Sequence, residues 1–111
     1  MNREHLIDAT CPDCRGPLNK INDEVALEFQ CLIGHRYSPA GLLQGHVEAQ
    51  ERALWAAVVA LEETPNIVGA VASYMQPDVL QELRAEAEHK VQQARQLRAV
   101  LNDLKPFRTG W

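Results

Sequence analysis

The chain has 111 residues and a formal net charge of −4, and 46% of its residues are hydrophobic while 23% are charged. This length accommodates one domain, or a small metal-binding unit followed by a helical extension. The mild acidity favours solubility and disfavours binding to nucleic acid or to an anionic lipid surface.

Residues 1–10 contain no basic segment followed by an apolar run, so no signal peptide is expected. No stretch is expected to reach the length of a membrane span, and we therefore expect a cytoplasmic protein without membrane contact. Residues 1–9 are predicted to form an arm ahead of the first structured unit.

Three cysteines and one histidine form the most informative pattern of the sequence. Cys11 and Cys14 belong to a Cys-Pro-Asp-Cys motif; after sixteen intervening residues, Cys31 and His35 belong to a Cys-Leu-Ile-Gly-His motif. Two short chelating turns, separated by the length of a two-stranded hairpin, are typical of a zinc ribbon. The sequence therefore predicts a zinc ribbon over residues 1–38.

Four protein ligands complete a tetrahedron and leave no position open for water or substrate, so we expect one structural zinc ion per chain. A disulfide would leave the third cysteine unpaired, and an intracellular chain with this spacing favours metal binding. A thioredoxin-like redox pair is disfavoured because no α/β pattern surrounds the Cys-x-x-Cys motif. The histidine disfavours iron in a site of thiolates alone.

The residues around the ligands suit two tight turns and a hairpin. Pro12 fixes φ in the first turn, and Gly16 is expected to take a positive φ there. Gly34, directly before His35, lets the backbone fold closely about the ion. Apolar side chains alternate with other residues at Val25, Leu27 and Phe29, which predicts a strand with one buried face.

Ser38 and Pro39 supply an N-cap and a proline at the first helical position, and they predict a helix over residues 39–63. Residues 54–61 are apolar nearly all round, so this part is expected to pack on two sides or to pair with another subunit.

Thr64 and Pro65 repeat the cap-and-proline signal and predict a second, shorter helix. No charged residue occurs from Thr64 to Pro77, which indicates either core or a binding surface. A third helix is predicted over residues 77–104, where leucine and alanine recur at spacings of three and four. This stripe favours a seam within one chain, with a coiled-coil dimer as the alternative.

The predicted fold class is mainly α with a small N-terminal zinc ribbon. A two-stranded, metal-stabilised hairpin precedes a helical hairpin or three-helix bundle over residues 39–105, and residues 106–111 form an irregular tail.

Several motifs recur in order between residues 10 and 63. They are Cys-Pro-Asp-Cys at 11–14, Cys-Leu-Ile-Gly-His-Arg-Tyr-Ser at 31–38, and Ala-Leu-Trp-Ala-Ala at 53–57. This stretch resembles the zinc-ribbon and helical segment appended to some bacterial chemotaxis methylesterase-like proteins. The resemblance implies a cytoplasmic bacterial protein related to signalling, and it does not transfer the enzyme, whose catalytic domain is a separate α/β unit.

The favoured function is a zinc-stabilised regulatory or adaptor module that acts through protein–protein interaction. Nucleic-acid binding is the alternative, although residues 10–38 carry three basic against four acidic side chains. An enzyme is not expected, because no carboxylate pair or serine lies in a catalytic pattern. A small-ligand sensor lined by Trp55, Tyr74 and Met75 is a further hypothesis.

Self-association is also expected. A small bundle offers little burial for its apolar helix residues, and a homodimer that covers residues 54–61 would remove them from water. A different protein partner on the same surface is the alternative.

Overall fold

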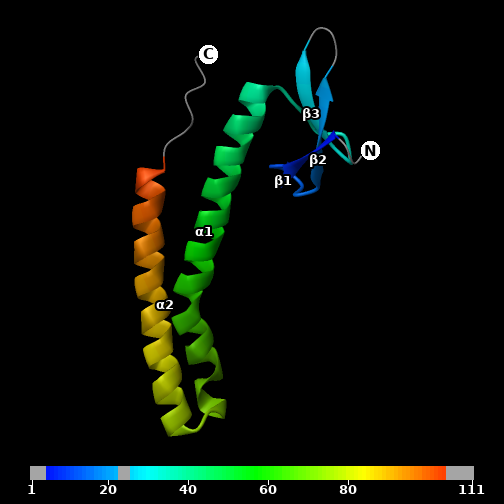
Figure 1. Cartoon of the computed structure of the whole chain (residues 1–111). Helices are drawn as coiled ribbons and strands as arrows, with labels where there is room; N and C mark the ends of the chain where they lie inside the picture. The colour runs from blue at the N-terminus through cyan, green and yellow to red at the C-terminus, as the bar shows by residue number, and fades with distance from the viewer. Residues whose placement is uncertain (1–4, 23–25, 105–111) are drawn as a thin grey trace. The chain divides into compact units, whose positions relative to one another are not determined.

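The computed structural model describes residues 5–22 and 26–104 (Figure 1). The chain divides into two compact units. The first, called the sheet unit here, is Met1–Gln50 with Lys105–Trp111, and the second, called the helical hairpin, is Glu51–Leu104. The predicted tail at 106–111 and the strand residue Val25 lie outside the described residues.

The sheet unit contains a four-stranded antiparallel sheet with the strand order β1-β2-β3-β4. The strands are β1 Leu6–Thr10, β2 Pro17–Asn22, β3 Leu27–Cys31 and β4 Arg36–Tyr37. The register places Leu18 of β2 opposite Cys31, the last residue of β3. Cys11, Leu18 and Cys31 are the buried centre of this unit.

The prediction of two strands is wrong, because the sheet has four. Residues 6–9, predicted as an arm, form most of β1, in which Ile7 alone is half-buried. A strand with one partly buried side chain shows no alternation for sequence analysis to detect. The strand β4 has two residues, too few for any period, and it exists through its pairing with β3.

The first helix, α1 Pro39–Val71, begins as predicted. The Ser38 hydroxyl accepts a hydrogen bond of 3.0 Å from the backbone N–H of Gly41, and its carbonyl accepts one of 2.8 Å from Leu42. Ser38 is therefore the N-cap, and Pro39 occupies the first position, where no N–H is needed.

The prediction that this helix ends at residue 63 and that a new one starts at Pro65 is wrong. The Thr64 hydroxyl donates backwards to the Ala60 carbonyl at 3.4 Å instead of capping a new helix. Pro65 removes one hydrogen bond from α1, yet the helix continues because Val68, 7% exposed, is buried one turn later. A short 3₁₀ helix, η2 Ala72–Tyr74, follows, so the described residues form two α-helices and not the three that were predicted.

The second α-helix, α2 Pro77–Asp103, agrees with the prediction to within one residue. Gln76 is its extended N-cap residue, Pro77 takes the first position, and Asp78 places an acid in the first turn. A negative charge there interacts favourably with the helix dipole.

A narrow seam joins the two helices side by side in the helical hairpin (Figure 1). Val58 of α1 and Ala94 of α2 are fully buried in it. Arg98 of α2 donates two hydrogen bonds to the Glu62 carboxylate, at 2.8 and 3.2 Å, and its guanidinium carbon lies 5.3 Å from the centre of the Trp55 ring. One side chain of α2 thus contacts two turns of α1 and fixes the register of the hairpin.

The expectation that no segment reaches membrane-spanning length is wrong on length and composition. The 36 residues Pro39–Tyr74 are long and apolar enough to cross a membrane, and 11% of the most apolar window is buried. Core helices of soluble proteins meet the same two criteria.

Candidate metal centre

The four predicted ligands lie on the two turns that connect neighbouring strands. Cys11 and Cys14 flank the turn between β1 and β2, whereas Cys31 ends β3 and His35 directly precedes β4. Because β2 and β3 pair along their whole length, the two turns meet at one edge of the sheet. Cys11 and His35, which are 24 residues apart in the sequence, are thereby brought into contact.

The first turn closes on itself through its backbone. The Arg15 N–H donates to the Cys11 carbonyl at 2.8 Å, and the Cys11 N–H donates to the Gly16 carbonyl at 2.7 Å. The positive φ falls on Arg15, at 64°, so the prediction that Gly16 takes it is wrong by one residue. The left-handed conformation costs a residue with a side chain some strain, which the turn's hydrogen bonds offset.

The second turn follows the prediction. Gly34 has φ = 104°, a conformation that glycine adopts without steric cost, and its N–H donates to the Cys31 carbonyl at 3.1 Å. The His35 N–H then points at the Cys31 sulfur, 3.3 Å away. Backbone donors of this kind stabilise a negatively charged sulfur.

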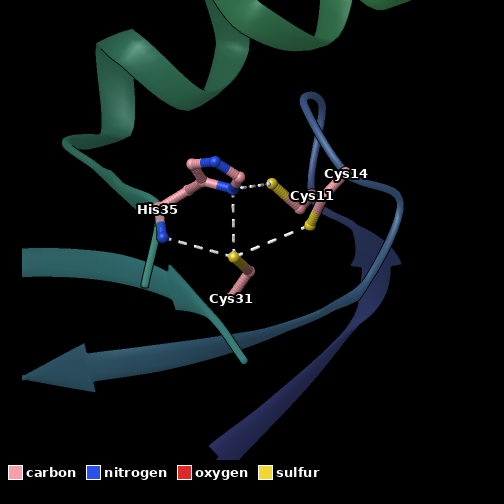
Figure 2. Close-up of side chains that lie close together, drawn as sticks. All are labelled: Cys11, Cys14, Cys31 and His35. Atoms are coloured by element: carbon pink, nitrogen blue, oxygen red, sulfur yellow. Dashed lines mark hydrogen bonds between the residues drawn. The ribbon is translucent and has the colours of Figure 1, made fainter. Parts of the chain in front are cut away.

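The ligand atoms of the four side chains all lie within 4.8 Å of one another (Figure 2). The Sγ atoms of Cys14 and Cys31 are 3.7 Å apart, and Nδ1 of His35 lies 3.6 Å from Cys11 Sγ and 3.3 Å from Cys31 Sγ. A tetrahedral zinc ion with ordinary bond lengths requires about 3.8 Å between sulfurs and about 3.6 Å between sulfur and nitrogen. Three of the six distances between ligand atoms are therefore close to those of a tetrahedral metal site, and Nδ1 is the histidine nitrogen that faces the sulfurs.

All three cysteines are free thiols, so no two members of the cluster are joined by a disulfide. Cys11 and Cys31 are buried, at 0% and 1% exposure, whereas Cys14 is exposed. No position of the tetrahedron is left for a substrate, so a metal held here would support structure instead of chemistry.

The electrostatics of the cluster favour a bound cation. Burial raises the pKa of the Cys11 thiol, but its hydrogen bond with the Tyr37 hydroxyl and those from the backbone N–H groups of Cys14 and Asp13 outweigh this effect, and the pKa falls to about 6. For Cys14, a hydrogen bond from the Gly16 N–H acts to lower the thiol pKa. Desolvation and the neighbouring sulfurs oppose another negative charge and outweigh this bond, so the Cys14 pKa is raised. Three thiolates at this distance would repel one another unless a positive ion lay between them.

His35 responds to the same negative sulfurs. Its pKa is raised, first by its hydrogen bond to Cys11 and then by that to Cys31. The ring therefore attracts a proton to the position that faces the sulfurs, which is where a metal ion would lie.

Tyr37 and Asp13 extend the cluster beyond its four ligands. The Tyr37 hydroxyl lies 3.2 Å from Cys11 Sγ and donates a short hydrogen bond to the Asp13 carboxylate. Sequence analysis gave Tyr37 no role at the site. The available signal was its place two residues after a ligand, on the strand that pairs with β3 through Phe29.

Substitution of Tyr37 by phenylalanine is expected to weaken metal affinity about tenfold, because groups that hydrogen-bond to ligands commonly tune affinity by this amount. Competition with a chromophoric chelator measures the effect. Tyr74→Phe is the matched control, because Tyr74 is 85% exposed and lies outside the sheet unit. Equal affinities for the two variants would show that the hydroxyl plays no part in the site.

The start of α1 packs directly on the first ligand turn. A Cβ atom on Gly45 would lie 3.1 Å from Cγ of Pro12, so the helix approaches the turn too closely for a side chain at this position. Leu42, one turn earlier, packs against the buried cysteines and Leu18. The first turns of α1 therefore belong to the same core as the ligands.

The comparison with protein-family models finds no match to this chain, and those with curated proteins and with solved structures find none either.

Proposed function

We propose that the protein is a zinc-stabilised, non-catalytic interaction module whose helical hairpin binds a protein partner. Zinc is the ion favoured by three thiolates and one imidazole in a tetrahedron of the dimensions given above. The metal would hold the sheet unit together, since so small a sheet buries few side chains of its own.

The observation that carries the proposal is an exposed apolar surface where α1 passes into α2. Ile67, Tyr74, Met75 and Val79 are 59%, 85%, 38% and 40% exposed, and we call these four residues the hairpin tip. The sequence from Thr64 to Pro77 has no charge. Of the two expectations for this stretch, core or binding surface, the exposure of these apolar side chains supports the surface.

The alternative of nucleic-acid binding is disfavoured by the charges of the sheet unit. Residues 10–38 carry Arg15, Lys20 and Arg36 against four acidic side chains. Arg36 also pairs with Glu28 at 3.6 Å, which reduces the charge available to a phosphate. Phosphate binding needs a surplus of basic side chains on one face.

A place in cytoplasmic bacterial signalling forms part of the proposal. It is supported by the three free thiols, which suit a reducing compartment, and by the resemblance of residues 10–63 to the segment appended to chemotaxis methylesterase-like proteins.

A photo-crosslinking residue placed at Tyr74 tests the function in the producing cell. We expect a crosslinked protein of different sequence, and we expect Ile67→Glu to abolish it because a charge in an apolar interface must be desolvated. A crosslinker at Val100, which is 49% exposed on α2, is the control for random capture. No crosslink at Tyr74, or the same products from both positions, would contradict the proposal.

A further inference from the structure

A second apolar surface lies on α1, separate from the hairpin tip. Trp55 and Val59 are 47% and 49% exposed although they are one turn apart in the middle of the helix. Val58, next to Val59, is fully buried in the seam with α2. Since adjacent residues on a helix are about 100° apart, Val59 belongs to a different face of α1 from the seam.

The positions around Val59 follow the spacing of a helix-pairing seam. Arg52, Ala56, Val59 and Glu63 are separated by four, three and four residues, and we call this set the back face. Alternating steps of three and four keep side chains on one stripe, as in coiled coils. The alanine makes close approach of a second helix possible, and Trp55 and Ala60 flank the stripe.

The large and small side chains of the back face fit those of a second copy of the helix that runs in the opposite direction. In an antiparallel pair centred between Ala57 and Val58, Val59 of one copy lies level with Ala56 of the other. Trp55 and Ala60 lie on opposite flanks of the stripe, so the Trp55 side chains of the two copies lie along the same flank of the pair. Within the stripe each Val59 meets an Ala56, which suits close packing of the two helices.

The charges of the back face select the same arrangement. In that register, Arg52 of one copy lies level with Glu63 of the other, twice by symmetry. A parallel pair would place Arg52 against Arg52 and Glu63 against Glu63, and like charges disfavour it. Glu62 is already bonded to Arg98, so Glu63 is the carboxylate that the back face presents.

We infer that α1 pairs through its back face with α1 of a second copy, in an antiparallel, two-fold symmetric dimer. The pairing places Arg52 opposite Glu63 and covers Trp55 and Val59, which are half-exposed in a single helical hairpin. It adds a self-association surface to the proposed function and does not involve the hairpin tip. A guanidinium has five N–H donors, so Arg52 can bond to Glu63 of the second copy while it keeps its contacts within its own copy.

Lipid is a poorer occupant for this surface than a second helix. A membrane would have to desolvate Arg52 and Glu63, which flank the apolar residues at both ends, and its anionic headgroups offer a counter-charge to Arg52 but none to Glu63. A second copy supplies both counter-charges in the same register that buries the apolar side chains.

Charge exchange across the dimer tests the inference by sedimentation over a range of micromolar concentrations. Arg52→Glu and Glu63→Arg are each expected to raise the dimer dissociation constant roughly tenfold or more, because two attractive pairs become two repulsive ones. The double variant is expected to restore it to within about threefold of the wild-type value, because the pairs re-form with reversed polarity. Glu86→Arg, an exposed charge reversal on α2, is the control and should leave the constant unchanged.

Circular dichroism of each variant checks that the hairpin has folded, and fluorescence gives an independent measure. In a Trp111→Phe background, Trp55 emission is expected to shift to shorter wavelength as the dimer forms. A protein that stays monomeric, or a dimer indifferent to both reversals, would overturn the inference. Flotation of the monomer with phosphatidylcholine–phosphatidylglycerol vesicles, abolished by Val59→Asp, would assign the back face to a membrane instead. None of these results affects the crosslinking experiment at Tyr74, so the dimer and the proposed function are tested independently.

Discussion

Removal of the metal is expected to unfold the sheet unit while the helical hairpin stays folded. Structural zinc contributes roughly 10–16 kcal/mol of apparent binding free energy in zinc-finger peptides, and in a unit this small that energy is folding energy. The buried centre of the sheet unit includes two of the ligands themselves, Cys11 and Cys31. Without a cation, the centre of the sheet unit would consist largely of thiol groups and a histidine, with few apolar side chains to hold it together.

The measurement combines elemental analysis, hydrogen exchange and circular dichroism. One zinc per chain is expected, and chelation should abolish amide protection in β2 and β3 while most of the helical signal remains. Cys31→Ser should reproduce the result without chelator, and Ser73→Cys, which adds a thiol at an exposed position of the helical hairpin, should not increase the zinc content. Protected β2 and β3 amides in the metal-free protein would show that the sheet unit folds on its own apolar core.

Val58→Asp is expected to have the opposite effect, destabilising the helical hairpin while zinc remains bound. Val58 is fully buried between α1 and α2, and an uncompensated charge at such a position costs about 3–5 kcal/mol. This is comparable with the whole stability of many small domains. Denaturant unfolding followed by circular dichroism should show the loss, and elemental analysis should still find the metal.

The matched control is Val100→Asp, the same change at a half-exposed site on α2. An exposed substitution is expected to alter stability by no more than about 0.5 kcal/mol. Zinc loss from the Val58→Asp protein would show that the two units fold as one, and equal effects of the two substitutions would show that the α1–α2 seam does not hold the hairpin.

The grouping of Cys11, Cys14, Cys31 and His35 could be predicted because its information is local. Each pair of candidate ligands lies within five residues of sequence, and Gly34 adopts the positive φ that its turn requires. The start of α1 was predictable for the same reason, since Ser38 bonds to the N–H three residues later. Such signals depend on backbone geometry that neighbouring residues determine by themselves.

The features that escaped sequence analysis depend on residues far apart. Thr64 and Pro65 look like the start of a helix, yet packing of α1 against α2 carries the helix through them, since tertiary contacts override local propensity. The bond between Glu62 and Arg98 joins residues 36 positions apart, and no spacing rule predicts it. Tyr37 similarly reaches Cys11 and Asp13 only because β4 folds back onto β3.

The unequal exposure of the candidate ligands would give metal exchange a direction. Cys11 and Cys31 are buried, whereas Cys14 is exposed and His35 is half-buried. A thiol-modifying reagent is therefore expected to react first at Cys14, which would detach one corner of the tetrahedron while the two buried cysteines still hold the ion. Release of a bound metal would then be stepwise, with the exposed thiolate as its entry point.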